Sequence, residues 1–113
     1  PADRSRLKQA FLNLIRNAKE AMPNGGKLAI ETAQSSMGSR ISIRDSGFGM
    51  NKATQEKSFE PFFTTKQNGT GLGLALTKNI VEEAQGTIQL ESESGKGTVF
   101  VLEFPSHEVG GNA

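Results

Sequence analysis

The sequence of 113 residues contains no cysteine and a single histidine, His107. A disulfide framework, a thiolate metal site and a cysteine nucleophile are therefore excluded. His107 lies in the C-terminal tail, and no second imidazole is available to share a metal with it. No apolar run approaches the length that crosses a membrane, and no signal peptide is visible. These absences predict a cytoplasmic domain without membrane contact, whether or not a parent protein is membrane-anchored.

An excess of charge of one sign is also missing. Lysine and arginine number 13 against 12 aspartate and glutamate residues, so the formal net charge is +1. Because nucleic acids and anionic membranes attract strongly basic proteins, neither is expected as a partner. The length suits one domain with a single core. The chain opens on Pro1 rather than methionine, which indicates a piece of a longer protein.

The spacing of apolar residues predicts two main helices. The first runs to about Met22, because apolar residues recur on one helical face: Leu7, Ala10, Phe11, Leu14, Ile15, Ala18 and Met22. The second runs from Thr70 to about Gln85, with Gly86 as its C-terminal stop. Its apolar residues recur at four-residue steps: Leu72, Leu76, Ile80 and Ala84. A short helix or loop is expected over Asn51–Ser58.

Alternating patterns predict two antiparallel strand pairs. The first pair is Lys27–Ser35 and Arg40–Asp45, with a turn near Met37–Ser39. The second pair is Thr87–Glu93 and Thr98–Phe104, joined at Ser94–Gly97. Apolar residues on both faces of Thr98–Phe104 are typical of a central strand.

Two asparagines, Asn13 and Asn17, are four residues apart and therefore stack on one side of the first helix, at the margin of its apolar face. Asparagine is unfavourable inside a helix unless its amide has a role. Two solvated amides beside a core face remain the alternative. Leu12 points away from the apolar face and suggests a covering element.

A carboxylate is predicted on an apolar strand face. Asp45 shares its face with Ile41 and Ile43 because side chains alternate along a strand. A carboxylate there is costly unless a donor satisfies it. Gly47 and Gly49 follow and allow the backbone to approach a bound group closely. The alternative is an ordinary Asp-Ser-Gly turn.

Three glycines at alternate positions, Gly69, Gly71 and Gly73, follow an aromatic patch formed by Phe59, Phe62 and Phe63. Such glycines let backbone N–H groups converge, and a helix that opens there favours an anion such as phosphate. A hinge between two elements explains the glycines equally well, so they leave both interpretations open.

Four motifs stand in a fixed order: NLIRNAKEA, DSGFG, FEPFFTTK and GTGLGL. Together they resemble the catalytic and ATP-binding domain of bacterial sensor histidine kinases, in the gyrase, Hsp90, histidine kinase and MutL superfamily. The FTTK ending is similar to kinases of nitrogen-regulation type. No P-loop or Rossmann motif is present. The resemblance predicts a domain over residues 1–105, followed by a flexible tail over 106–113.

The resemblance implies an α/β (α+β) two-layer sandwich of the Bergerat type, with a mixed, mainly antiparallel sheet and helices on one face. Members generally have one or two strands before the first helix, and this chain begins almost at that helix. The sheet is therefore expected either to have an exposed edge or to borrow a strand from elsewhere.

The same resemblance implies ATP and Mg²⁺ as cofactors and assigns residues to them. Asn17 matches the asparagine that ligates Mg²⁺, and Asn13 matches one a turn earlier. Asp45 matches the aspartate that accepts from the adenine amino group, Gly47 and Gly49 lie beside the base, and Thr98 supports the aspartate. The remaining matches are phosphate-loop or lid positions: Lys66, Gly69, Thr70, Gly71, Leu72, Gly73 and Leu74. Asn13, Asn17 and Lys66 form the expected catalytic set.

The implied activity is that of a protein-histidine kinase. The γ-phosphoryl group of ATP would pass to a histidine on a separate phosphoacceptor and dimerisation domain, and a response regulator receiver domain would follow. The domain is expected to be monomeric within a homodimeric parent. An ATPase clamp of gyrase or Hsp90 type is disfavoured, because those relatives carry a glutamate where this chain has Asn13. A non-catalytic nucleotide-binding regulatory module stays open.

Overall fold

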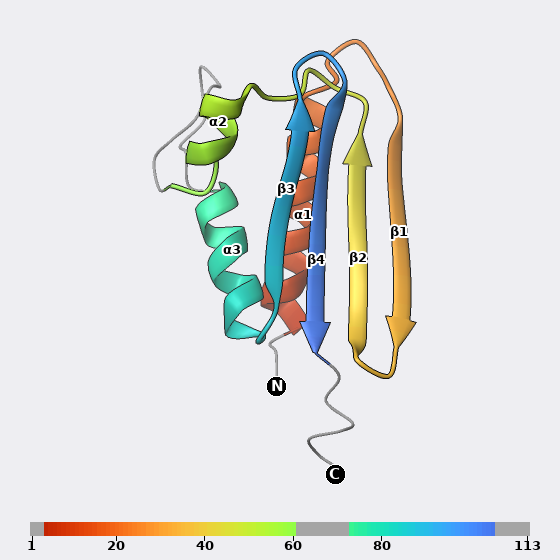
Figure 1. Cartoon of the computed structure of the whole chain (residues 1–113), viewed down its shortest axis with the longest axis vertical. Coiled ribbons are helices and arrows are strands. Elements are labelled where there is room, and N and C mark those ends of the chain that lie inside the picture. Colours follow the sequence, from red (N-terminus) through yellow and green to blue (C-terminus); the bar gives the residue numbers. More distant parts are fainter. Residues whose placement is uncertain (1–3, 61–72, 106–113) are drawn as a thin grey trace.

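The structure is a computed structural model and describes residues 4–60 and 73–105. In this part of the chain, the helices are α1 (Arg4–Glu20), α2 (Lys52–Lys57) and α3 (Gly73–Glu83). The strands are β1 (Leu28–Ser35), β2 (Gly38–Asp45), β3 (Thr87–Glu93) and β4 (Gly97–Pro105). Figure 1 shows the four strands side by side with α1 behind them. The predicted elements are confirmed, and their described ends differ from the predicted ends by at most two residues. The predicted start of the second main helix, Thr70, lies outside the described residues.

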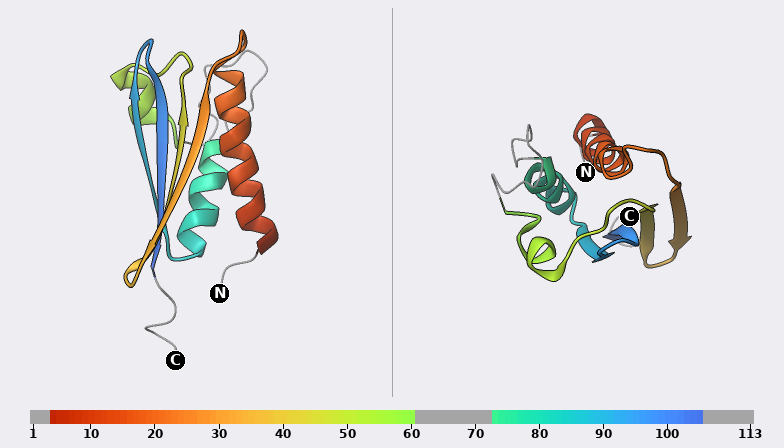
Figure 2. Two further views of the ribbon diagram at one scale, coloured as in Figure 1. Left: turned by 90° about the vertical axis from the view of Figure 1, so that its right-hand side faces the viewer. Right: turned by 90° about the horizontal axis from the view of Figure 1, so that it is seen from above.

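The strands form one sheet in the order β1-β2-β4-β3, and every pair of neighbours is antiparallel. The mainly antiparallel character is as predicted, but the described strands include no parallel pair that would make the sheet mixed. The first turn lies at Ser36 and Met37, because Gly38 already belongs to β2. β4 occupies a central position, as its apolar residues on both faces predicted. α1 and α3 lie side by side on one face of the sheet, so the predicted two-layer sandwich is confirmed (Figure 2).

α1 buries the face that its apolar spacing predicted. Ala10, Leu14 and Ala18 are buried, and Leu14 joins the core on the inner sheet face. α3 packs antiparallel to α1 (Figure 2). An ion pair of 2.9 Å between Arg6 Nη2 and Glu83 Oε1 links the first turn of α1 to the end of α3. This exposed pair lies where the start of α1 meets the end of α3.

α3 buries most of the predicted face and also residues beside it. Ile80 and Ala84 are buried as predicted, whereas Leu76 is only half-buried. Thr77 and Val81 are buried although the four-residue steps do not include them. A step of four residues overshoots one helical turn by about 40°, so a row of such steps drifts off the core face. The helix also ends differently, since Gln85 adopts the left-handed conformation (φ 67°). Gly86 has a different role, because a Cβ at this position would lie only 2.7 Å from Cδ1 of Phe104. The absence of a side chain lets the chain pack closely against that ring.

β1 is an exposed edge strand, which confirms one of the two outcomes expected for the sheet. All eight of its residues are exposed, including Leu28 and Ile30 on the face that α1 covers further along the sheet. Leu12 of α1 is also 51% exposed, as its position off the apolar face predicted. Neither α1 nor α3 extends over β1 (Figure 2).

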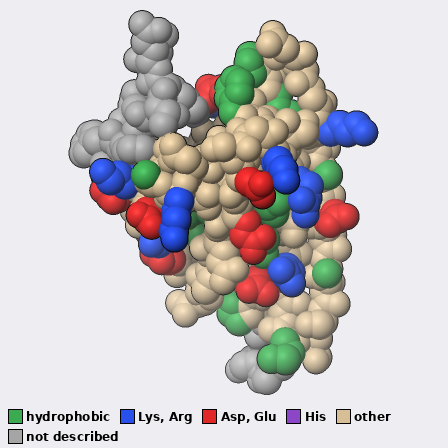
Figure 3. All heavy atoms as spheres, turned by 45° about the horizontal axis from the view of Figure 1, so that its top comes forward, with side chains coloured by type: hydrophobic (Ala, Val, Ile, Leu, Met, Phe, Trp, Pro, Cys, Tyr) green, Lys and Arg blue, Asp and Glu red, His purple; other side chains and the backbone are tan. Residues whose placement is uncertain are grey.

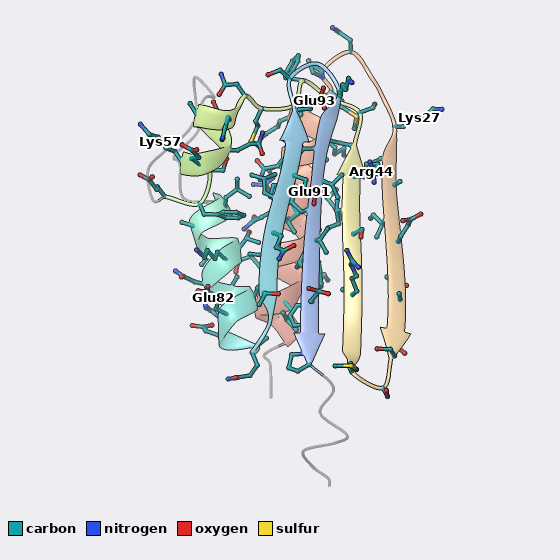
Figure 4. All side chains as sticks on the ribbon, viewed as in Figure 1. Lys27, Arg44, Lys57, Glu82, Glu91 and Glu93 are labelled. Carbon is teal, nitrogen blue, oxygen red and sulfur yellow. The ribbon has the colours of Figure 1, made fainter. Side chains whose placement is uncertain are left out.

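The outer face of the sheet carries polar and charged residues. Val99 of β4 pairs with Arg44 of β2 on one side and with Glu91 of β3 on the other. Arg44 and Glu91 lie on the sheet face turned away from α1 (Figure 4). Acidic and basic side chains are interleaved over the face drawn in Figure 3. In residues 4–60 and 73–105, no helix is long and apolar enough to cross a membrane.

Candidate functional site

A row of four residues crosses the sheet near the β3–β4 hairpin. Leu28 of β1 pairs with Asp45 of β2, Asp45 pairs with Thr98 of β4, and Thr98 pairs with Ser92 of β3. Side chains in register on one face of a sheet are neighbours, with Cβ atoms about 4.5–5.5 Å apart. Three polar side chains therefore lie next to one another on the helix-covered face.

Asp45 ends β2 with its carboxylate turned inward, as the alternation predicted. The residue is 6% exposed, and its Oδ1 accepts a hydrogen bond of 2.8 Å from the Gly47 N–H. No basic side chain of the described residues forms an ion pair with it. A buried carboxylate with one neutral donor is poorly compensated, so the site favours a ligand that brings a further donor.

The Ser46–Met50 loop is held against both α1 and the hairpin. The Phe48 N–H donates to the Ala21 carbonyl (3.1 Å), and the Gly95 N–H donates to the Phe48 carbonyl (2.6 Å). A Cβ at Gly47 would collide with the backbone of Ala21. Gly49 has φ +71° and would collide with the Glu93 carbonyl if it carried a side chain. The two glycines therefore bring the loop close to its neighbours beside Asp45.

Ser92 and Thr98 form a compact hydroxyl network at the other end of the row. Ser92 Oγ lies 2.8 Å from Thr98 Oγ1, 2.9 Å from the Gly97 carbonyl and 2.8 Å from the Met50 N–H. Gln55 of α2 donates to the carbonyls of Ser92 (2.8 Å) and Met50 (3.0 Å). Thr98 itself is 5% exposed. The network ties the loop end and α2 to the polar row.

The two predicted asparagines lie on α1 beside α3. Both are half-buried, and Asn13 Nδ2 lies 3.5 Å from Thr77 Oγ1, a long hydrogen bond. Thr77 is fully buried and donates to the Gly73 carbonyl (2.8 Å). Because the helices are antiparallel, one turn up α1 from Asn13 corresponds to one turn back along α3 from Thr77. Asn17 therefore lies level with Gly73, the start of α3.

Of the remaining predicted residues, two belong to the described part of the chain and five do not. Gly73 opens α3, and a Cβ there would meet open space, so crowding does not explain that glycine. The Leu74 side chain packs against the core, which leaves its backbone for any ligand. Lys66, Gly69, Thr70, Gly71 and Leu72 lie outside the described residues.

Sequence reasoning missed two residues, Ser92 and Thr77. Each is a hydroxyl on a face of otherwise apolar residues, Ser92 beyond Ile88 and Leu90, and Thr77 among Ile80, Val81 and Ala84. The signal at both positions is a polar residue where the periodicity of the element predicts an apolar core residue. The partners of each hydroxyl come from distant parts of the sequence, so the signal does not identify them.

Replacing Thr77 by valine should lower the free energy of unfolding by about 0.5–1.5 kcal/mol, the net worth of the short hydrogen bond to the Gly73 carbonyl. Shape is kept, and the 3.5 Å contact with Asn13 adds little. Serine at the same position keeps both bonds and is the matched control. Urea denaturation measures the two variants. A larger loss for Thr77→Ser than for Thr77→Val would mean that the methyl group, and not the hydroxyl, matters there.

A metal ion held at this site would share its ligands with a bound molecule. The described residues contain no group of three or more histidine, aspartate or glutamate side chains that could hold a metal ion. Mg²⁺ in phosphate-binding enzymes takes few protein ligands and completes its octahedron with phosphates and water. The amide oxygen of Asn17 fits that pattern, because a single neutral ligand suits an ion that also takes phosphates and water and does not suit a cage made of protein groups alone.

Comparisons with known proteins show the family of this chain. A family model for "Histidine kinase-, DNA gyrase B-, and HSP90-like ATPase" matches residues 2–108. Sporulation kinase C of Bacillus subtilis (strain 168) is 44% identical over 103 residues, which are 91% of this chain and 24% of the relative. The sensor histidine kinase ZraS of Escherichia coli (strain K12) is 46% identical over 104 residues, 92% of this chain and 22% of the relative.

Among solved structures, the nucleotide-free catalytic domain of the histidine kinase ThkA superposes with a TM-score of 0.81 at 42% identity. That alignment covers 92% of this chain and 68% of the ThkA chain. The chain belongs to the histidine kinase, DNA gyrase B and HSP90-like ATPase family. Within it, the relatives named here are histidine kinases, so this is an ATP-binding catalytic domain of the histidine kinase type. It spans about a quarter of the length of the two curated relatives.

Proposed function

We propose that this chain binds Mg-ATP and passes its γ-phosphoryl group to a histidine on a separate phosphoacceptor and dimerisation domain. The observation that carries the proposal is the pairing of two site ends. At one end, the buried Asp45 carboxylate accepts from one neutral donor, the Gly47 N–H, and at the other end Asn17 lies level with the start of α3. A neutral donor group and an anionic group, joined in one ligand, would satisfy the two ends together. An adenine nucleotide has that form.

Each end of the site supports a different part of the ligand. Asp45, with Thr98 beside it, would accept from the adenine amino group, and Gly47 and Gly49 let the backbone lie against the base. The opening turn of α3 offers backbone N–H groups and a positive dipole end to phosphate, with Gly73 and Leu74 as its first residues. Asn17 would ligate Mg²⁺, and Asn13 lies one turn further from the base.

When bound, Mg²⁺ would neutralise charge that develops on the phosphates during transfer. The residues of this chain then act by position: the amides hold the phosphate end in place, and the inward carboxylate fixes the base. We also assign five residues to the site from their sequence motif alone: Lys66, Gly69, Thr70, Gly71 and Leu72. Among them, Lys66 would contact the terminal phosphates. The nitrogen-regulation type likewise stays a prediction from the FTTK motif.

The wider assignments follow from the same proposal. We assign residues 1–105 to the catalytic domain and 106–113 to a tail, place the domain in the cytoplasm, and expect a receiver domain to take the phosphoryl group onward. Asn13 argues against an ATPase clamp, because a neutral amide cannot take a proton from an attacking water. A purely regulatory nucleotide-binding module would keep the binding and lose the transfer.

A transfer assay tests the function. With radiolabelled ATP and Mg²⁺, this chain should label the parent's phosphoacceptor domain supplied in trans, and it should not label itself, since His107 follows the last strand.

Asn17→Ala should abolish transfer and reduce the Mg²⁺ dependence of nucleotide affinity. Folding should be nearly preserved, because the residue lies at the margin of the core.

Two results of that assay would contradict parts of the proposal. ATP binding without transfer to the added domain would favour the regulatory module. Full transfer by Asn17→Ala, with unchanged metal dependence, would remove Asn17 from the metal site and return it to a solvated helix position.

A further inference from the structure

We infer that Ser92 determines base specificity by fixing the direction of the Thr98 hydroxyl. The inference rests on the proposed function, because it concerns how the Asp45 end of the site distinguishes one base from another. The polar row ends in a hydrogen-bond network in which each hydroxyl group supplies a single hydrogen.

Ser92 has one hydroxyl hydrogen, and its contacts show which acceptor receives it. The Gly97 carbonyl can only accept, so the 2.9 Å contact between Ser92 Oγ and that carbonyl uses the serine hydrogen. The Met50 N–H donates to the same Oγ at 2.8 Å. The remaining contact of Ser92 Oγ, 2.8 Å to Thr98 Oγ1, then needs the threonine hydrogen. Ser92 therefore holds the Thr98 hydroxyl with its hydrogen pointing toward β3.

The consequence appears on the other side of Thr98, where Asp45 is its partner in register. With its hydrogen turned toward Ser92, Thr98 presents only lone pairs toward the carboxylate. Asp45 is also an acceptor, and both side chains are about 5–6% exposed. Two buried acceptors side by side favour a donor between them and disfavour a third acceptor. An exocyclic amino group, directly or through water, is such a donor, and a ring carbonyl is not.

Ser92 thus acts through another residue, and it is a positioning residue. Its bond to the Met50 N–H also anchors the end of the loop that contains Gly47 and Gly49. Loss of that anchor would weaken every nucleotide to a similar degree. Loss of control over Thr98 would instead change the ratio of affinities between two bases, because only then can the threonine hydroxyl rotate and donate to a carbonyl.

The experiment measures calorimetric affinities for ATP and ITP with Mg²⁺ present. Inosine carries a carbonyl where adenosine carries the amino group. The wild-type chain should prefer ATP, and Ser92→Ala should lower the preference by roughly 3- to 10-fold, the range of one net hydrogen bond. Ser92→Thr keeps a hydroxyl at that position and should retain the preference. Ser92→Cys, with a poor acceptor of similar size, should behave like alanine and replaces it if that variant does not fold.

Two controls separate this role from general damage. Ser58 is buried, donates to the Thr54 carbonyl and lies 3.3 Å from Met50 Sδ, but is outside the polar row. Ser58→Ala should therefore leave the preference unchanged. In a Thr98→Val background, Ser92→Ala should no longer alter the preference, because the hydroxyl that it positions is absent.

Each outcome identifies which idea fails. Equal affinity of the wild-type chain for ATP and ITP would contradict base reading by Asp45, and the inference with it. A wild-type preference that survives Ser92→Ala and Ser92→Cys, even if both nucleotides bind more weakly, would overturn the role of Ser92 alone. A change in preference that persists in the Thr98→Val background would also overturn it.

Discussion

Asp45→Asn is expected to weaken ATP binding by about 1–3 kcal/mol, the cost of losing a charge-assisted hydrogen bond in a buried site. The same substitution should leave the free energy of unfolding unchanged or raise it. Asparagine keeps the acceptor for the Gly47 N–H and removes a buried charge that no described basic side chain pairs with. A carboxylate that costs stability and supports binding is a functional group and not a structural one.

Calorimetry with ATP and GTP measures the binding half of this prediction, and urea denaturation measures the stability half. GTP offers a carbonyl where ATP offers the amino group, so the wild-type chain should prefer ATP and Asp45→Asn should reduce that preference. Equal affinity of the wild-type chain for both nucleotides would remove the assignment of Asp45. A marked loss of stability in Asp45→Asn would show that the carboxylate serves the fold.

Gly49→Ala should destabilise the domain by about 2 kcal/mol or more and should also reduce ATP affinity. The residue has φ +71°, a conformation that costs about 1–2 kcal/mol for a side chain, and its Cβ would collide with the Glu93 carbonyl. The loop must then move away from the hairpin. Because that loop joins Asp45 to Met50, its displacement disturbs the base end of the site.

Gly95→Ala is the matched control for this prediction. Gly95 has φ +81° but open space around the position of a Cβ, so its substitution adds backbone strain without a collision. Urea denaturation of the two variants isolates the collision as the difference between their unfolding free energies. Losses of equal size would mean that the loop yields easily and that close packing at Gly49 does not hold it in place.

The fold was largely predictable from local patterns. Alternation located β2 and β4, helical spacing located α1, and Gly-rich turns separated the elements. α3 shows the limit of that reasoning, because four-residue steps select Leu76, which is only half-buried, and miss Thr77 and Val81, which are buried. Which helical face is buried depends on the angle at which the helix meets the sheet, and neighbouring residues along the chain do not encode that angle.

The site was predictable in its residue types and not in its connections. The period of two in β2 was enough to place Asp45 on the buried face, and four-residue spacing placed Asn13 and Asn17 together. Asn17 lies level with Gly73 only because α1 and α3 are antiparallel. Gly49 was expected to lie near a ligand, whereas the structure shows that it also avoids a collision with Glu93.

By itself, the sequence determined which side chains could do the chemistry: an inward carboxylate, two stacked amides and glycines where backbone must come close. Strand and helix periods are local, so these features follow from neighbouring residues. The tertiary structure alone decided that Ser92, Thr98 and Asp45 lie in one row. The direction of these hydrogen bonds depends on which donors and acceptors face each other on neighbouring strands. The register of β2, β4 and β3 determines which residues face each other.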